Sequence, residues 1–145
     1  MNGSSTSLEL RIDWIDIDLL GHVNNLAILR YVQIARVLHL ETIGLMPIQS
    51  ANGTGPILAS VNCQFRKPLF YPGNVTVLSR VEEVKNTSFR IRHEIRNDSD
   101  EIAAEAQDII VLIDFGTNTK LTLPDDLRKR LEGLECAERS QALAE

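Results

Sequence analysis

The most apolar segment of this chain lies between Asn24 and Ile43, where 12 of 20 residues carry apolar side chains. These positions spread around most of a helical wheel, and a helix that is apolar on most sides is usually buried. Asn24 or Asn25 can cap the first turn of such a helix, and Gly44 is suited to end it. The pattern therefore predicts one long, buried helix over residues 24–43.

Segments that alternate between apolar and polar residues lie on both sides of this helix. Leu8 to Ile15 alternates and predicts a first strand, whereas the small polar residues 1–7 predict a frayed terminus. A loop rich in proline and glycine follows the helix at 46–56. Four further strands are then expected at 57–66, 75–84, 89–96 and 102–115. The short turns between successive strands indicate an antiparallel meander.

A short C-terminal helix is expected after these strands. Pro124 stands beside Asp125 and Asp126, and a proline with acidic neighbours is typical of a helix start. An apolar stripe follows at Leu127, Leu131 and Leu134. The tail from about Glu135 is expected to be loosely held.

Together these elements indicate an α+β fold, in which a curved antiparallel sheet of about five strands wraps around a long central helix. One sheet leaves part of such an apolar helix uncovered, so we expect a second copy of the chain to cover the rest. The expected organisation is a single domain over residues 1–145, with its core at about 8–133 and flexible termini.

Composition narrows the classes of function. The net charge of −5 argues against nucleic acid or an anionic membrane as a partner, because both favour basic surfaces. No apolar run reaches the roughly 18 residues of a membrane helix, and the first residues lack the features of a secretory signal. Cys63 and Cys136 are far apart and not in a metal-binding spacing. We therefore expect reduced cysteines and a cytoplasmic protein.

The segment DIDLLGHVNN, from Asp16 to Asn25, places many polar groups directly before the predicted buried helix. A helix N-terminus presents free N–H groups and about half a positive charge, which polarise a carbonyl and stabilise an oxyanion. A carboxylate held beside it can act as a nucleophile or as a base that activates water. This combination is suited to acyl transfer to water.

The same segment also carries a resemblance to a known family. The family-like positions are Arg11 to Trp14, the D-x-D-x-x-G-H-V-N-N motif at 16–25, Leu29, Tyr31 and Ala35-Arg36, then Phe65 to Leu69, Pro72-Gly73, Ser88-Phe89, Ala104-Glu105 and Leu123-Pro124. Over about residues 8–133 the chain resembles the hotdog-fold acyl-CoA thioesterases of the 4-hydroxybenzoyl-CoA thioesterase type. The resemblance implies a hotdog fold, a homodimer or homotetramer with active sites at the subunit interface, and hydrolysis of an acyl-CoA to a free acid and CoA, as in fatty acid metabolism.

The resemblance also implies roles for single residues. The catalytic carboxylate falls on Asp18, and the N–H group that polarises the thioester carbonyl falls among Val23, Asn24 and Asn25. Whether Asp18 attacks directly or activates water stays open. His22 either orients Asp18, donates to the substrate or packs the loop.

Further positions are implied around the substrate. A backbone donor near the thioester is one interpretation of Gly55 and Ala59-Ser60; the alternative is that Gly55 is an ordinary loop residue. Many relatives have an aromatic residue where this chain has Ile28, which alters the expected acyl pocket. They have glutamate where it has Gln33, so a second carboxylate is missing there.

The charged residues allow a functional and a structural interpretation. Arg66, Lys67, Arg90 and Arg92 can hold the phosphates of CoA, because guanidinium and ammonium groups suit phosphate oxygens; alternatively, they form a solvated sheet face. Asp16 is interpreted as a loop-stabilising residue, with substrate contact as the alternative.

No cofactor is expected, and the histidines outside the loop are interpreted as structural. The spacing of Asp16, Asp18 and His22 fits no standard set of metal ligands, so no metal site is predicted. His93 shares a strand face with apolar residues and is expected to be buried and hydrogen-bonded. His39 lies late in the helix, where a structural role is expected.

Three other classes of function compete with an acyl-CoA thioesterase. They are a non-hydrolytic hotdog module that binds an acyl thioester, a hydrolase that acts on acyl carrier protein thioesters, and a hotdog dehydratase. The dehydratase is disfavoured because its usual His-containing, Pro-Gly-rich loop is missing. No G-x-S-x-G or Walker-type segment indicates a serine hydrolase or an NTPase.

Overall fold

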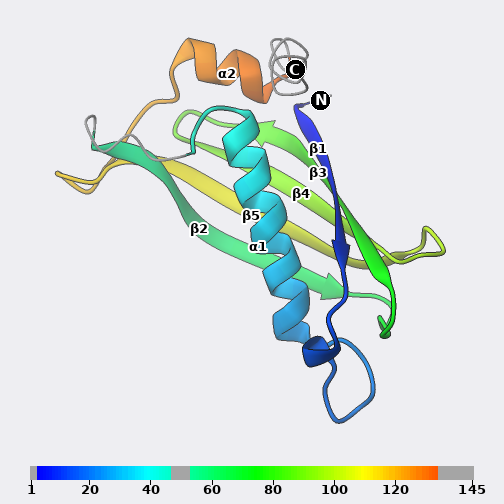
Figure 1. The fold of residues 1–145 in the computed structure, drawn as a ribbon. Coiled ribbons are helices and arrows are strands. Elements are labelled where there is room, and N and C mark those ends of the chain that lie inside the picture. The colour runs from blue at the N-terminus through cyan, green and yellow to red at the C-terminus, as the bar shows by residue number, and fades with distance from the viewer. Residues whose placement is uncertain (1–2, 47–52, 134–145) are drawn as a thin grey trace.

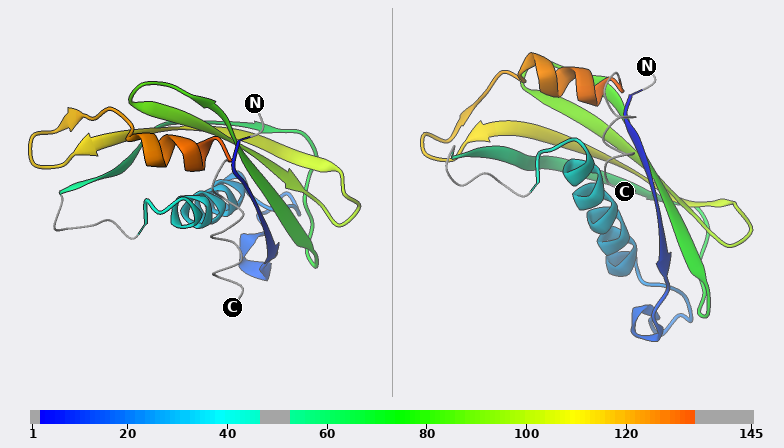
Figure 2. Two further views of the ribbon diagram at one scale, coloured as in Figure 1. Left: turned by 90° about the horizontal axis from the view of Figure 1, so that it is seen from above. Right: turned by 45° about the horizontal axis from the view of Figure 1, so that its top comes forward.

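A long helix crosses one face of a curved antiparallel sheet (Figure 1). The computed structural model describes residues 3–46 and 53–133. Its elements are β1 (Ser5–Arg11), the short 3-10 helix η1 (Trp14–Asp16), α1 (Asn25–Thr42), β2 (Thr54–Phe65), β3 (Asn74–Val84), β4 (Ser88–Arg96), β5 (Ile102–Asp114), β6 (Thr119–Lys120) and α2 (Asp125–Leu131). Figure 2 shows that α1 lies on the inner side of the curve and that α2 lies near one end of the sheet.

The strand order is β1-β3-β4-β5-β2, and the two-residue strand β6 pairs with β5. Only β3, β4 and β5 form the expected meander, so the prediction that β2 lies next to β3 was wrong. Residues 66–73 carry the chain away from β2 past the N-terminal end of α1, where Leu69 O accepts a hydrogen bond from Val23 N. Alternation along a strand does not reveal its neighbours, which is why this crossing was missed.

The N-terminal segment also differs from the prediction. β1 begins at Ser5 rather than Leu8, and Ser4 is buried, with its N–H bonded to Leu131 O. The strand ends at Arg11 because the chain then turns into η1, where Asp13 N donates to Asp16 Oδ2 over 3.1 Å. Trp14 consequently leaves the strand face and is 74% exposed.

The long helix has nearly the predicted bounds. Asn24 caps it, because its side-chain Oδ1 accepts the N–H of Ala27 at 2.8 Å. Gly44 follows the helix with a φ of +83°, a conformation that glycine adopts without steric cost. Only one side of α1 is buried. Its buried residues are Ala27, Ile28, Tyr31, Val32, Ala35, His39 and Leu40.

Much of the other side of α1 is open to solvent in the single chain. Leu26 is 72% and Ile34 is 39% exposed, so the expectation of burial on nearly all sides does not hold within one chain. The edge strand β2 likewise exposes Leu58, Val61 and Phe65.

The C-terminal helix begins where the sequence predicted, with Pro124 as its N-cap. Leu127 and Leu131 are buried against the end of the core that lies near Leu40 and Ile43. The predictions for Leu134, for the tail from Glu135 and for Cys136 lie outside the described residues, as does most of the predicted loop at 46–56. None of the described helices is long and apolar enough to cross a membrane.

Candidate functional site

The loop between η1 and α1 is closed by hydrogen bonds at its base. Ile17 and Val23 form an isolated antiparallel bridge, and Asp18 N donates to His22 O at 3.1 Å. Below that bridge, Asp16 O accepts both the N–H and the side-chain amide of Asn24, each at 2.9 Å. The tip that carries Asp18 is therefore held at a defined place beside the first turn of α1.

Asp16 anchors the base of this loop. Its side chain is 2% exposed, and its Oδ2 accepts the hydroxyl of Tyr31 at 2.8 Å while its Oδ1 accepts Arg30 at 2.8 Å. Burial alone would raise the pKa of the Asp16 carboxyl, but the hydrogen bonds from Tyr31, Arg30 and Asp13 outweigh it, and the pKa is lowered. The carboxylate is fully occupied by groups of its own chain, which agrees with the loop-stabilising interpretation.

A cleft of about 380 Å³ brings together several residues that are distant in sequence. Of the predicted site residues, Asp18, His22, Val23, Asn25, Arg66 and Lys67 line it. Ile28, Phe65 and Leu69 supply apolar surface to the same cleft. The cleft thus combines a carboxylate, an imidazole, two basic side chains and an apolar wall at the N-terminal end of α1.

Asp18 lines this cleft and has one carboxylate oxygen without a partner among the described residues. Its Oδ1 accepts the N–H of Leu20 at 2.9 Å, and no bond to its Oδ2 occurs within the described part of the chain. Asp18 is exposed in the single chain. His22 stands at the same cleft with its ring edge-on to Phe70, 5.8 Å between centroids. Asp18 is therefore oriented by its own loop and still accessible to a bound molecule.

The amides at the helix N-terminus are not equally available. Val23 N already donates to Leu69 O at 2.8 Å, and Asn24 N donates to Asp16 O at 2.9 Å. Of the three predicted positions, only Asn25 has an N–H with no acceptor among the described residues, and Asn25 lines the cleft. The Asn24 side chain is occupied in capping the helix and in binding Asp16 O.

Two of the predicted basic residues lie at the rim of the cleft. Arg66 and Lys67 are each about half exposed, and each is paired with one carboxylate: Arg66 with Glu105, and Lys67 with Glu101. Both reach the cleft from the segment that follows β2, so they can approach a negatively charged group that enters from solvent.

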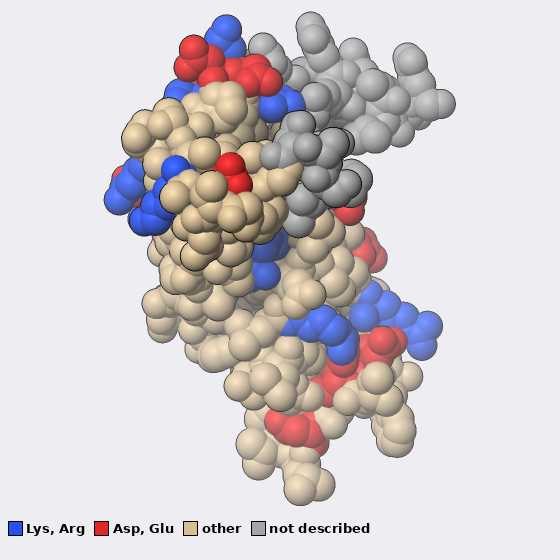
Figure 3. Space-filling view, turned by 90° about the vertical axis from the view of Figure 1, so that its left-hand side faces the viewer, with Lys and Arg blue, Asp and Glu red and all other residues tan. Residues whose placement is uncertain are grey.

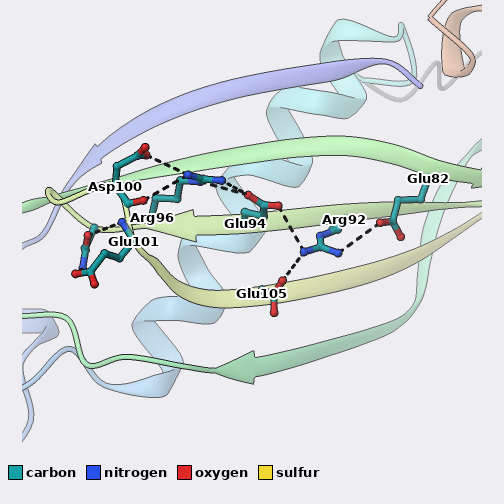
Figure 4. Close-up of polar contacts among 8 residues, drawn as sticks. Glu82, Arg92, Glu94, Arg96, Asp100, Glu101 and Glu105 are labelled. Carbon is teal, nitrogen blue, oxygen red and sulfur yellow. Dashed lines mark hydrogen bonds and ion pairs between the residues drawn. The ribbon is translucent and has the colours of Figure 1, made fainter. Parts of the chain in front are cut away.

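Arg92 and Arg90 lie elsewhere, on the outer face of the sheet. β4 alternates between buried residues that face α1 and partly exposed residues that face away from it, and both arginines belong to the second set. Arg92 pairs with Glu82, Glu94 and Glu105 (Figure 4), and Arg90 pairs with Glu82 and Glu83. Arg92 is therefore held in a network of carboxylates on the outer face and does not line the cleft.

The predicted backbone donors of β2 are also not in the cleft. Gly55 is buried near the start of the strand, and Ala59 and Ser60 are exposed where the pairing with β5 shifts register. Gln33 is an exposed residue of α1 and does not line the cleft either, whereas Ile28 does.

Sequence reasoning missed two contributors to this site. Tyr31 appeared only as a family-like position, although a tyrosine on the buried side of a helix needs a partner for its hydroxyl, and Asp16 is that partner. Nothing in the sequence around Phe70 predicts its contact with His22. The two residues meet only because the segment after β2 crosses the N-terminal end of α1.

Residues 12–131 of the chain match the family model of the thioesterase-like superfamily. The chain is 24% identical over 125 residues to the long-chain acyl-CoA thioesterase FadM of Escherichia coli (strain K12). The matched region covers 86% of this chain and 95% of that protein.

Solved structures with the same arrangement of elements are also similar. Slr0204, a 1,4-dihydroxy-2-naphthoyl-CoA thioesterase from Synechocystis, superposes with a TM-score of 0.78 at 21% identity, over 88% of this chain and 96% of that one. SAV2348 from Staphylococcus aureus, in complex with CoA, superposes with a TM-score of 0.83 at 10% identity, over 92% of this chain and 85% of that one.

Proposed function

We propose, because the chain belongs to the thioesterase-like superfamily, that it hydrolyses an acyl-CoA thioester to a free acid and CoA in the cleft of Asp18. The expectation of a hotdog fold is confirmed by the fold and its structural neighbours, and that of a thioester hydrolase is confirmed at the level of the family. The single observation that carries the proposal is that one cleft is lined by Asp18, a carboxylate residue, and by Asn25, whose N–H has no acceptor among the described residues.

In the proposed reaction, the thioester carbonyl oxygen accepts the N–H of Asn25, which stabilises the negative charge that develops on that oxygen. Asp18 Oδ2 either attacks the carbonyl carbon or takes a proton from a water that attacks it. In both routes the carbon–sulfur bond breaks, the thiolate leaves and takes up a proton, and water supplies the second oxygen of the acid. In the first route, water hydrolyses the acyl–Asp18 anhydride and restores the carboxylate.

The basic and apolar residues of the cleft fit the two ends of such a substrate. Arg66 and Lys67 stand at the rim, where they would bind the phosphates of CoA in exchange for their carboxylate partners. Ile28, Phe65 and Leu69 offer the apolar surface that an acyl group would bury.

The proposed active form is a homo-oligomer in which a second copy covers the exposed side of α1 and the inner side of β2. Asp18 and the neighbouring Leu19 and Leu20 are exposed in one protomer. The electrostatic interaction of the Asp18 carboxylate with a substrate becomes stronger when water is excluded from the site. A second copy that covers this surface would therefore complete the active site.

The decisive experiment compares Asp18→Asn with the unmodified protein in a thiol-release assay over short, long and aromatic acyl-CoAs. The amide keeps the shape of the side chain but cannot attack or accept a proton. We expect turnover to fall by about a hundredfold or more, the usual size of a lost general base. Asp126→Asn, at an exposed position of α2, should leave turnover unchanged.

Retention of near-normal thiol release by Asp18→Asn on every substrate would overturn the proposed mechanism. Tight acyl-CoA binding with no thiol release by the unmodified protein would instead identify a binding module. Release from an acyl carrier protein thioester, with none from acyl-CoA, would replace the proposed carrier.

A further inference from the structure

The hydroxyl of Tyr31 is a buried polar group that contacts the base of the catalytic loop and that the proposed reaction does not use. Tyr31 belongs to the second turn of α1 and is 1% exposed. It is not among the residues that line the cleft. Its hydroxyl donates to Asp16 Oδ2 at 2.8 Å, and that bond is buried.

Asp16, which Tyr31 binds, also bonds to two other parts of the site: η1 and the first turn of α1. Its side chain binds α1 through Tyr31 and Arg30, and Asp13 N donates to the same Oδ2 at 3.1 Å. Its backbone oxygen accepts two hydrogen bonds from Asn24, the residue that caps α1. One residue therefore ties the body of the helix, its first turn and η1 together. Figure 1 shows η1, in dark blue, beside the N-terminal end of α1.

The loop tip has few other restraints. Above the bridge between Ile17 and Val23, the described bonds of the tip join its own residues, with Asp18 as a partner in each: Asp18 N to His22 O, Leu20 N to Asp18 Oδ1 and Gly21 N to Asp18 O. These bonds shape the tip but do not fix its distance from α1. At the base, Asp16 and Asn24 connect the loop to α1, while Val23 N and the ring of His22 contact the segment after β2.

The chemistry of the pair suits a permanent restraint. Burial, and then the hydrogen bond to Asp16, raise the pKa of Tyr31 above its ordinary value, so the phenol stays protonated and remains a donor. A phenol that donates to an ionised carboxylate forms one of the stronger hydrogen bonds found in proteins. The bond is therefore present throughout the pH range in which a thioesterase would be assayed.

We infer that Tyr31 is a positioning residue for the hydrolysis: its hydroxyl holds Asp16, and through Asp16 it sets the Asp18 carboxylate at its working distance from the N–H of Asn25. This inference rests on the proposed function. It assigns to Tyr31 an effect on the rate of the chemical step, because a misplacement of about 1 Å can cost a hundredfold in rate.

The test is Tyr31→Phe, which keeps the ring in the core and removes only the hydroxyl. We expect kcat to fall by about ten- to a hundredfold while KM changes less than about twofold, because the residues at the rim and the apolar wall are untouched. Asp16→Asn should lower kcat similarly, and the double variant should lose little more than either single one, because both changes break the same link.

Two controls separate positioning from general damage. Tyr71→Phe removes the hydroxyl of the only other tyrosine, which is partly exposed, and should leave kcat unchanged. Leu127→Ala creates a cavity in the cluster near α2, so it should lower the stability but not kcat at a temperature where the variant stays folded.

An unchanged kcat in folded Tyr31→Phe, with Asp18→Asn inactive, would leave the proposed function standing and reduce Tyr31 to a structural role. Full additivity of the Tyr31 and Asp16 variants would also overturn the inference. If Asp18→Asn were active, the proposed function would fail first, and the inference would fail with it.

Discussion

At the scale of one residue, His39 shows how burial changes the pKa of a side chain. It has no exposed surface, and its ring nitrogens lie 2.8 Å from Ser4 Oγ and 3.1 Å from Thr6 Oγ1. Burial, and then the neighbouring His93, lower the pKa of His39 to about 4. These contacts agree with the structural role predicted for His39, and they show why residues 4–6 are ordered rather than frayed.

This lowered pKa makes the folding stability depend on pH. The unfolded chain protonates His39 near pH 6.5, but the folded protein resists protonation until about pH 4. Stability from this residue is therefore complete above about pH 6.5 and is lost as the pH falls toward 4, by about 3 kcal/mol in total. Urea unfolding at pH 7, 6, 5 and 4 measures this loss, and His39→Gln should reduce it.

Two carboxyl groups make the folding stability depend on pH in a lower range than His39 does. Their effect can therefore be measured separately from that of His39. The pKa values of Asp16 and Asp108 are lowered, so their contribution is present above their ordinary value near 3.8 and is lost only below it. An equally steep loss between pH 6.5 and 4 in His39→Gln would show that another group is responsible.

At the scale of elements, a layer of polar side chains joins α1 to the middle of the sheet. Arg36 of α1 donates from Nε and a terminal nitrogen to the two oxygens of Asp108 on β5, at 2.7 Å and 3.1 Å. Asp108 also lies 2.7 Å from His93 Nε2 on β4, and His93 Nδ1 lies 2.7 Å from Ser79 Oγ on β3. The prediction that His93 is buried and hydrogen-bonded is confirmed. The layer separates the two hydrophobic clusters of the core.

Asp108→Asn tests the contribution of this layer. An amide leaves the largely buried Arg36 guanidinium without its countercharge, and breaking such a pair typically costs about 3–5 kcal/mol. The free energy of unfolding from urea titration at pH 7 gives the value. Asp100→Asn, which removes an exposed partner of Arg96, should cost less than about 1 kcal/mol. Equal losses in the two variants would contradict a special role for the buried pair.

At the scale of the whole molecule, apolar side chains are exposed on two neighbouring surfaces. Leu58, Val61 and Phe65 of β2 are each at least two fifths exposed, and α1 exposes Leu26 and Ile34. Charged side chains occupy only scattered parts of the side on which β2 lies, as Figure 3 shows. β2 is also an edge strand, so its outer backbone groups are not paired within the sheet. These features support the proposed homo-oligomer.

Val61→Glu tests this assembly. It places a charge on the inner side of β2, where burial against a second copy would be costly, so we expect the variant to be monomeric and much less active. Gln64→Glu, on the outer side of the same strand, is the matched control and should keep the oligomer. Sedimentation velocity at micromolar concentration distinguishes the species. A wild-type monomer, or a Val61→Glu variant that stays assembled, would refute the proposed interface.

How much of the molecule was predictable depended on the range of the interaction. The helix over 24–43, its Asn24 cap and the strands from β3 to β5 follow from local periodicity and from capping chemistry, so the predictions were close. The end of β1 was misjudged because Asp13 and Asp16 turn the chain through a side-chain contact that alternation does not show. Arg92 was grouped with Arg66 by charge, and both pair with Glu105, but Arg92 also pairs with Glu82 and Glu94 and does not line the cleft.

The sequence by itself determined the long helix, the polar loop before it and the resemblance that points to Asp18, because each depends on residues that are close along the chain. Only the tertiary structure decided that β2 lies at the edge beside β5 and that Tyr31 holds Asp16. It also decided that Asn25, rather than Val23 or Asn24, has an N–H with no acceptor in the described part of the chain. The physical reason is that hydrogen-bond partners and burial are properties of the packed chain. A polar group becomes available or occupied only when distant segments meet it.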